Sequence, residues 1–467
     1  MNWGNEWKLP AIEAIQYNGR PCIKTKDLWH ALHLSFNMAQ DHHINISLLD
    51  EITKKCTTMW YLFSEAEFIS SVNKCNNLST PRPDKLSWRH LKSIIKDNAC
   101  LKKIINIADA CFELGHWLSQ FKVSTSIIIS KPNKKLYDFP KSFRPIVLLN
   151  MIGKLIEKVI SKRLQFQLIS NNFIHLSQLG GLKQCSTTNA GIVLTHFIHT
   201  SWVKNNIIST LAFNITQFFP SLNHQLLLLV FNKAGFDPKV SLFFRNYLVR
   251  RKTQYFWNNF SSSFCNVDVG VSQGLALSPI LSALYIAPVL HILEKWFKNL
   301  KIPVFILLFV DDGLLVAQKK SLIASNYFLF CNYHITFFLL EKLRLIIKYR
   351  KIEMFHFSRS HGVFEPPSLD LSPLGSPILC PRNMWHYLRF IFNRKLSFCQ
   401  HINFYANKAI SIVKYMRMLR NSVHGLVSNQ KWLLYRSYVF SIALYRFQLW
   451  CYNKTPLSYF LKELDKM

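Results

Sequence analysis

The sequence predicts a fold that contains both α-helices and β-strands, because two patterns occur along the chain. Short runs rich in β-branched and other apolar residues, such as 123–130 and 207–213, are typical of strands. Longer segments with apolar residues at helical spacing, such as 88–118 and 278–298, predict helices. The chain has 467 residues, which at about 100–200 residues per domain is enough for two to four domains or one large multi-lobed protein.

The composition excludes several classes of protein. Hydrophobic residues make up 49% of the chain, which excludes disorder as the main state, and the 14 glycines exclude a collagen-like repeat. The net charge is +32, from 57 basic and only 25 acidic residues, so missing acids contribute as much as surplus bases. Such a charge favours a polyanionic partner such as nucleic acid. Drift in composition is the alternative explanation.

The cysteine pattern indicates a reducing compartment. The eleven cysteines form no CxxC pair and are odd in number, which argues against a zinc site and against a disulfide framework. The first residues lack a basic segment followed by an apolar one, and no run of about 18 uncharged apolar residues occurs. We therefore expect a nuclear or cytoplasmic protein that is not secreted and has no membrane partner.

The elements can be predicted in chain order. Residues 1–75 are weakly patterned and are interpreted as an N-terminal extension or linker, and the Pro- and Ser-rich stretch 76–85 predicts a loop. A helix over 88–118 and a strand over 122–130 follow. The later predictions are helix 146–168, strand 207–213, helices 223–234 and 238–248, strands 253–258 and 265–271 paired around the turn 258–263, helix 278–298, strands 304–310 and 314–317, and helices 404–419 and 430–449.

Two adjacent acids, Asp311 and Asp312, lie between the apolar strands 304–310 and 314–317. A strand–turn–strand with both acids at its tip is the expected local structure. Carboxylates gathered at a strand end commonly hold a cation. A simple β-turn, in which aspartate is favoured at the corners, is the alternative for this pair taken alone.

Seven segments together carry a family resemblance. They are SFRPIVLLNMIGKLIEKVISKRL (142–164), SQLGGLKQCSTTNA (177–190), LAFNITQFFPSLNH (211–224), GVSQGLALSPILSALYI (270–286), FVDDGLLVA (309–317), KIEMFHFSR (351–359) and YLRFIFNRKLSF (387–398). In this order and spacing they resemble the reverse transcriptase of non-LTR (LINE-like) retrotransposons. The resemblance runs over about residues 78–400 and is specific because the segments are collinear. A group II intron or retron polymerase is the nearest alternative enzyme.

The resemblance implies the α+β class and, within it, a right-hand polymerase fold. It divides the chain into the extension 1–75, fingers 76–200, a palm 201–398 whose antiparallel sheet carries the acids, and a truncated helical thumb 399–467. It also implies an RNA template, a DNA primer and dNTPs as partners. The upstream endonuclease and downstream domains that are usual in the family are expected to be absent from this chain, which therefore resembles a truncated copy.

The resemblance also implies a catalytic site that uses two Mg²⁺ ions. Nucleotidyl transfer needs two ions about 4 Å apart, held by carboxylates from neighbouring strands. Asp311 and Asp312 match two of the family's metal ligands, but Asn214 stands where the family has its principal bridging aspartate. An amide brings no charge, so we expect an impaired or inactive enzyme. Lys351 matches the lysine near the leaving pyrophosphate, as a possible general acid, with an ordinary exposed lysine as the alternative.

Five further residues match substrate-binding positions of the family. Arg144 matches the residue that grips the triphosphate, and Gln273 and Gly274 match the turn beside the incoming base pair. Phe219 matches the aromatic gate that excludes a ribose 2′ hydroxyl, with a core aromatic as the alternative. Lys131 matches a contact to the template backbone, with an exposed lysine as the alternative.

The departures from the family pattern share a direction. Each is reachable from the family residue by one C·G→T·A change, which predicts a degenerate copy of the element; transversions in the nucleotide sequence would contradict this. Glycines replaced by arginine are expected to have had a positive φ. Three functions stay open: an impaired polymerase, a non-catalytic nucleic-acid-binding relic, and an unfolded pseudogene product. The departures are Arg82 and Arg389 for Gly, Cys185 for Arg, Asn189 and Asn214 for Asp, Ser272 for Pro, and Leu275 for Ser.

Overall fold

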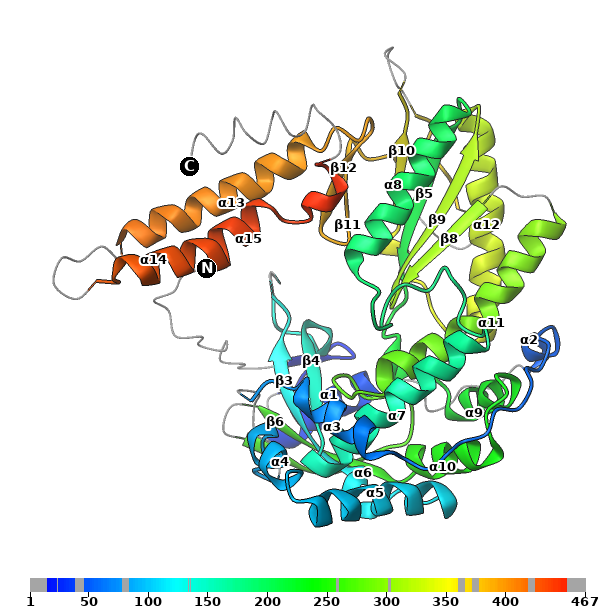
Figure 1. Ribbon diagram of the computed structural model, residues 1–467. Helices are drawn as coiled ribbons and strands as arrows, with labels where there is room; N and C mark the ends of the chain where they lie inside the picture. Colours follow the sequence, from blue (N-terminus) through cyan, green and yellow to red (C-terminus); the bar gives the residue numbers. More distant parts are fainter. Residues whose placement is uncertain are drawn as a thin grey trace. The chain divides into compact units, whose positions relative to one another are not determined.

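The computed structural model describes residues 15–22, 24–37, 46–77, 84–132, 134, 136–257, 260–300, 304–359, 366–371, 378–418 and 425–451 (Figure 1). The chain forms two compact units. Unit 1 contains residues 1–183, 215–295 and 336–346, and unit 2 contains residues 184–214, 296–335 and 347–467. The sequence predicts four subdomains with boundaries at residues 75, 200 and 398. The division into two compact units does not test these boundaries, which stay a prediction. The predicted α+β class is confirmed by the mixture of helices and largely antiparallel sheets.

Unit 2 contains a four-stranded antiparallel sheet of order β10–β5–β9–β8 (Figure 1). The strands expected at 207–213 and 304–310 are present, and the one expected at 314–317 is longer on both sides. Leu211 and Leu314 are fully buried, which is typical of strands whose apolar residues fill a core. The strands are β5 (Ile207–Asn214), β8 (Val304–Phe309), β9 (Asp312–Lys319) and β10 (Glu353–Phe357).

Helix α8 (Thr187–Val203) packs on this sheet, and the rings of Phe197 and Phe305 stack with centroids 5.1 Å apart. The helix begins with a capping box in which Ser186 and Asn189 each accept the other's backbone N–H. The remaining elements of unit 2 are the first part of α12 (Leu322–Lys342), the 3₁₀ turns Tyr349–Lys351 and Phe447–Leu449, the hairpin β11 (Met384–Tyr387) and β12 (Phe390–Asn393), and the helices α13 (Cys399–Met418), α14 (Ser428–Leu434) and α15 (Phe440–Ala443).

The C-terminal helices correct two predictions. The helix expected at 404–419 begins earlier, at Cys399. The continuous helix expected over 430–449 is wrong, because α14 and α15 are joined by a π-helical turn, Tyr435–Val439, and helical structure breaks after Ala443. Arg446 has a left-handed backbone with φ +59, which no right-handed helix can contain.

Unit 1 contains a second four-stranded sheet of order β4–β3–β6–β7, in which β3 and β6 run parallel and the other pairs antiparallel. The helix predicted over 146–168 is wrong at its start. Residues up to Leu148 pair with β3 instead, and α7 (Met151–Ser170) begins after Asn150, whose side chain accepts the Gly153 N–H at 2.8 Å. The strands are β3 (Val123–Ser130), β4 (Phe143–Leu148), β6 (Arg251–Trp257) and β7 (Phe260–Val267).

The predicted pairing of two strands after residue 250 is confirmed, but its register differs. Trp257 pairs with Phe260, so β7 occupies residues that the sequence assigned to a turn, and it ends at Val267 instead of Val271. A tight connection leaves more backbone hydrogen bonds paired across the hairpin than the six-residue turn would. Residues 258–259 lie outside the described residues.

The helix predicted over 88–118 is two helices, α4 (Trp88–Ile94) and α5 (Asn98–Glu113), because Asp97 caps α5 by accepting the Ala99 and Cys100 N–H groups. The predicted helices α9 (His224–Lys233), α10 (Pro238–Leu248) and α11 (Ser278–Asn299) are confirmed. The other elements of unit 1 are β1 (Ile15–Tyr17), β2 (Arg20–Cys22), α1 (Thr25–Phe36), α2 (Ser47–Asp50), α3 (Glu65–Asn73), α6 (Ser119–Lys122) and the 3₁₀ turns Pro140–Ser142 and Phe219–Ser221.

Two helices among the described residues have the length and composition to cross a membrane, α11 and α12. The apolar stretch of α11 is 78% buried inside the protein, and that of α12 is 39% buried. A helix in the core of a folded domain is apolar on most sides, because most of its surface contacts other parts of the protein. Burial against the protein therefore accounts for the apolar sequence of α11.

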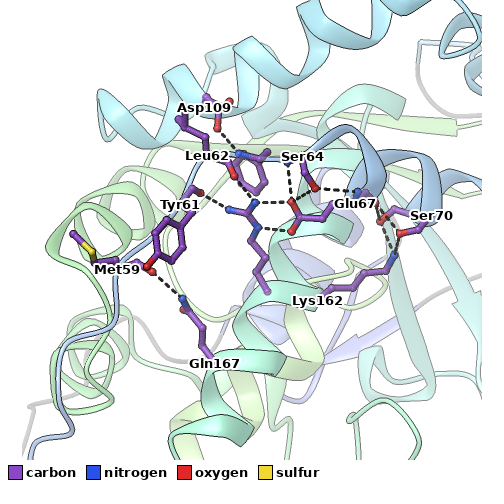
Figure 2. Close-up of polar contacts among 12 residues, drawn as sticks. Met59, Tyr61, Leu62, Ser64, Glu67, Ser70, Asp109, Lys162 and Gln167 are labelled. Atoms are coloured by element: carbon purple, nitrogen blue, oxygen red, sulfur yellow. Dashed lines mark hydrogen bonds and ion pairs between the residues drawn. The ribbon is translucent and has the colours of Figure 1, made fainter.

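Part of the predicted N-terminal extension is held on α7 by one arginine (Figure 2). The Arg163 guanidinium forms a forked ion pair with Glu67, with both N–O distances 2.5 Å, and donates to the Tyr61 and Leu62 carbonyls. Its Cζ lies 4.1 Å from the centroid of the Phe63 ring. The neighbouring Lys162 donates to Ser71, and Gln167 to the Met59 carbonyl. Residues 59–71 therefore pack on α7.

Replacing Arg163 by lysine is expected to lower the free energy of unfolding by about 2 kcal/mol, because an ammonium cannot reproduce the planar fork or its stacking. Urea unfolding followed by circular dichroism measures the change. Arg89→Lys, at an exposed arginine of α4, is the matched control and should change stability by at most about 0.5 kcal/mol. Equal stability of the Arg163 variant and the unmodified chain would contradict this account.

One of the replaced glycines lies in a hairpin turn. Tyr387 pairs with Phe390, so β11 and β12 are joined by the two residues Leu388 and Arg389, which have φ of +47° and +69°. Positive φ at both positions is the pattern of a type I′ turn, which favours glycine at the second position. The expectation of a positive φ at residue 389 is confirmed, while Arg82 lies outside the described residues.

Arg389→Gly is therefore expected to stabilise the chain, by about 1 kcal/mol, because glycine adopts this backbone conformation without steric cost. Thermal unfolding monitors the change. Lys395→Gly serves as the control, since this exposed turn residue is described and does not have a positive φ. The control should be neutral or destabilising, and a stabilisation of the same size in both variants would show that the turn carries no strain.

Candidate active site

Two acids and one amide meet where β5 and β9 lie side by side. Asn214, the last residue of β5, pairs with Asp312, the first residue of β9. The Asn214 Nδ2 donates to Asp312 Oδ1 at 2.9 Å and to Asp311 Oδ2 at 3.1 Å. All three residues are half-buried. The expected adjacency of residue 214 and the paired aspartates is therefore observed, and their catalytic and metal-binding roles stay predictions.

The backbone around the acids is tightly constrained. Phe309 pairs with Asp312, so Val310 and Asp311 form a two-residue turn, and Val310 has φ +61. A β-branched residue rarely adopts a positive φ, so the turn carries strain of the kind that is often found at functional sites. Gly313 follows the acids, and a Cβ there would lie 2.2 Å from Cζ of Phe213. The Phe213 ring thus requires glycine at position 313.

The electrostatics of the site favour a positive partner. Burial raises the pKa of Asp312 above its usual value, and the negative charge of Asp311 raises it further. The hydrogen bond from Asn214 and the positive charge of Lys351 act in the opposite direction on this pKa. Two close carboxylates in a partly buried site repel each other, so a bound cation or proton stabilises them.

Lys351 lies near the acids at the end of the 3₁₀ turn Tyr349–Lys351. Its side chain is exposed, and its charge acts on Asp312. The segment is attached to β5, because the Lys348 N–H donates to the Asn214 carbonyl at 2.9 Å. Unit 2 therefore brings together all four residues that were predicted to be catalytic.

Three of the predicted substrate-binding residues are neighbours in unit 1. Arg144 is exposed on β4, opposite Ile129 of β3. The Val147 N–H of the same strand donates to the Gln273 carbonyl at 3.0 Å. Gly274 has φ +99, and a Cβ there would lie 3.4 Å from Ile146 Cγ2. The turn with Gln273 and Gly274 thus lies against the strand that carries Arg144.

The other two substrate-binding candidates, Phe219 and Lys131, are also in unit 1. Phe219 is half-buried in its 3₁₀ turn, whereas the adjacent Phe218 is fully buried, so Phe218 is the core aromatic of the pair. The Lys131 Nζ donates to the Lys141 carbonyl at 2.7 Å. Their contacts with a nucleotide and with a template stay predictions.

Comparison with known proteins identifies the family. Residues 129–392, more than half of the chain, match the family model described as reverse transcriptase (RNA-dependent DNA polymerase). The chain belongs to the reverse transcriptase family. The predicted membership and the right-hand polymerase fold that it implies are confirmed. Members of this family generally use divalent metal ions and act on nucleic acid templates.

The chain is similar to proteins of Drosophila melanogaster mobile elements. It is 24% identical over 330 residues to the RNA-directed DNA polymerase from mobile element jockey, covering 69% of this chain and 34% of that protein. It is 23% identical over 351 residues to the probable RNA-directed DNA polymerase from transposon BS, covering 74% and 37%. These matches confirm the predicted non-LTR type. The chain spans about a third of the length of these curated relatives.

Among solved structures, the chain is similar to apo telomerase from Candida tropicalis truncated from its C-terminal domain. The TM-score is 0.39, with 14% sequence identity over 53% of this chain and 52% of that chain.

The acids of this site fit one divalent cation better than a bridged pair. Asp311 and Asp312 offer the hard oxygen ligands that such ions prefer. Asn214 presents N–H donors to both carboxylates, and an N–H group cannot bind a cation. If the Asn214 side-chain amide were rotated by about 180°, it would offer one oxygen ligand that carries no charge. Asp311 and Asp312 are therefore the residues that would hold a metal ion.

One residue beside the site was not assigned a role from the sequence. Tyr387 of β11 is buried, and its hydroxyl has no hydrogen-bond partner among the described residues. Burial raises its pKa, and the negative charge of Asp312 raises it further. The sequence contained the signal, because Tyr387 opens the family-like segment 387–398, but only the fold shows that the phenol is buried and affected by the charge of Asp312.

Proposed function

We propose that the chain is an RNA-directed DNA polymerase of a non-LTR retrotransposon that is impaired by the amide at residue 214. The observation that carries the proposal is the meeting of Asn214, Asp311 and Asp312 at the paired ends of β5 and β9, in a chain of the reverse transcriptase family. The substrates are an RNA template, a DNA primer and dNTPs.

The metal-binding residues in this proposal are Asp311 and Asp312, and the metal is Mg²⁺. Mg²⁺ prefers carboxylate oxygens and shares its coordination shell with phosphates. Divalent ions held by these residues would supply Lewis-acid activation of the primer 3′ hydroxyl and neutralisation of the triphosphate. Asn214 supports only part of this task, since it contributes no negative charge. We propose that this loss leaves polymerase activity low or absent.

The remaining candidates act on the nucleotide and template. Lys351, whose charge already acts on Asp312, donates a proton to the leaving pyrophosphate. Arg144 grips the triphosphate through its guanidinium fork. Gln273 and Gly274 flank the new base pair, since glycine allows close backbone approach. Phe219 excludes a ribose 2′ hydroxyl, and Lys131 contacts the template backbone.

The setting of the protein is part of the proposal. We place it in the nucleus or cytoplasm, a location that the eleven free thiols support. The basic composition supports a nucleic-acid partner. The endonuclease and downstream domains of the family would act as partners from outside residues 1–467.

A primer-extension assay on an RNA template, with Mg²⁺ and separately with Mn²⁺, tests the proposed function. We expect weak or no extension by the unmodified chain and clear extension by Asn214→Asp. Binding of the same template–primer, measured across salt concentrations, is the second readout. Salt-dependent binding without extension by either protein would indicate a non-catalytic binder. Robust extension by the unmodified chain would refute the proposed impairment.

A further inference from the structure

Unit 1 contains a group of side chains of the kind that bind transition metals. The described residues His175, His291 and Glu294 each offer a ligand atom, and these atoms lie within 4.8 Å of one another. His291 and Glu294 are one turn apart on α11, so both project from the same face of the helix. His175 lies in the loop that follows α7. The group therefore joins a loop to a helix.

The imidazole of His291 is held in an orientation suitable for binding a metal. Its Nε2 donates to the Phe173 carbonyl at 2.7 Å, which leaves Nδ1 with a lone pair. Histidines that bind metals commonly donate their other ring N–H to a carbonyl in this way. The rings of His175 and His291 meet edge to face, with centroids 5.2 Å apart. The flanking Leu290 and Leu293 are fully buried, so α11 is firmly anchored at this point.

A hydrogen bond between His175 and Glu294 occupies the position where a metal ion would bind. His175 Nε2 and Glu294 Oε2 are 2.9 Å apart, and His175 Nδ1 accepts the Ser177 N–H at 3.1 Å. These contacts place the imidazole proton on Nε2. A metal bound at Nε2 moves that proton to Nδ1, and the Ser177 bond is then lost. The net charge of the imidazole does not change.

Charges of both signs lie near the group. The Glu294 carboxylate attracts a cation, and Lys55, which acts on His291, opposes one. A metal that binds both imidazoles needs them in the neutral form.

We propose that His175, His291 and Glu294 form a Zn²⁺ site, with water in the fourth position. Two imidazoles and one carboxylate are a known ligand set for zinc, whereas Mg²⁺ prefers oxygen ligands alone. Bonds of about 2.0–2.1 Å place tetrahedral ligand atoms about 3.4 Å from one another. On binding, ligand atoms now up to 4.8 Å apart therefore approach by at most about 1.4 Å, and the His175 Nε2–Glu294 Oε2 pair, now 2.9 Å apart, opens by about 0.5 Å. The metal ties the loop after α7 to α11. This site is independent of the proposed polymerase function.

The test is titration of the purified full chain with Zn²⁺, in the presence of excess Mg²⁺ to occupy carboxylate sites. A chromophoric chelator competes for the zinc and gives the affinity. Co²⁺ in place of Zn²⁺ gives a visible absorption spectrum that reports the ligands. We expect one tight site, with affinity lowered by at least about a hundredfold in His291→Gln. His116→Gln, at an exposed histidine of unit 1, should stay within about twofold.

A second variant keeps the test decisive if His291→Gln does not fold, as judged by circular dichroism. Glu294→Gln changes an exposed side chain and should weaken zinc binding by at least about tenfold. Unchanged zinc affinity in the variant that folds would overturn the proposal. Thiolate bands in the Co²⁺ spectrum would also overturn it, because they would assign the metal to cysteines.

Discussion

Replacing Asn214 by aspartate is expected to raise Mg²⁺-dependent primer extension on an RNA template by at least about a thousandfold. The variant places a third carboxylate beside Asp311 and Asp312, whose oxygens lie 3.1 and 2.9 Å from the Asn214 amide nitrogen. It restores a charged ligand that can bridge two ions, which an amide cannot do. Rates of single-nucleotide addition measure the effect.

Two control variants show whether the gain in extension comes from the carboxylate at residue 214 or from any added negative charge in the same unit. Asn189→Asp makes the same substitution at an exposed position of α8 in the same unit and should leave extension unchanged. The double variant Asn214→Asp with Asp312→Asn should lose the gain, because it again has one acid too few. A gain that survives in the double variant would contradict the proposed ligand set.

Stability provides a readout of the same substitution that does not depend on activity. Three carboxylates without a cation repel each other in a half-buried site. Asn214→Asp should therefore lower the melting temperature in EDTA, and Mg²⁺ should restore it. Mg²⁺ should raise the melting temperature of the unmodified chain by a smaller amount. An equal response of both proteins to Mg²⁺ would indicate that residue 214 does not take part in metal binding.

The second large effect is expected at a buried acid. Glu157 of α7 is fully buried and accepts a 2.6 Å hydrogen bond from the Tyr247 hydroxyl. Burial raises its pKa from 4.5 to about 7, more than the Tyr247 bond and the charges of Arg251 and Lys154 lower it. The folded protein therefore keeps a proton on Glu157 at pH values where the unfolded chain has lost it.

Stability consequently falls as pH rises. The contribution of Glu157 is fully present below pH 4.5 and is lost as pH rises to about 7, with a total of about 3 kcal/mol. Glu157→Gln keeps an acceptor for Tyr247 and removes the ionisation. This variant should match the unmodified chain near pH 4.5 and exceed its free energy of unfolding by about 3 kcal/mol at pH 8.

Urea unfolding of both proteins between pH 4.5 and pH 8 checks this prediction. Glu65→Gln, at an exposed glutamate of α3, is the control for the loss of one charge. If Glu157 were ionised in the fold and stabilised by Arg251, Glu157→Gln would instead be less stable than the unmodified chain at every pH. That outcome would contradict the account.

The family departures have unequal structural consequences. Arg389 occupies a turn with a positive φ, so its cost is in the backbone. Asn189 still accepts the Ser186 N–H, so its cap survives without the charge. Leu275 is buried with Val147 and Leu149, so an apolar side chain is accommodated there. Asn214 is the departure that changes the charge of the candidate active site.

Local patterns in the sequence were sufficient to predict three strands of the unit 2 sheet, β5, β8 and β9, and the acids at its hairpin, whereas β10 was not predicted. Runs of apolar residues from 207 and from 304 carry the period and composition of strands, and these properties depend on neighbouring residues alone. The seven collinear segments were sufficient to predict the family. A positive φ at Arg389 also followed from the resemblance, because the family has glycine at this position.

Long-range contacts determine the features of the structure that local sequence patterns do not predict. The strand at 143–148 forms because β3 pairs with it, although the following residues favour a helix. The pairing of Asn214 with Asp312, which the family resemblance anticipated, and the meeting of His175 with His291 join residues far apart in the chain, and the burial of Glu157 also depends on distant contacts. No local pattern encodes which segments pair or which side chains lose contact with water. These features depend on tertiary packing, and they set the charge and chemistry of both proposed sites.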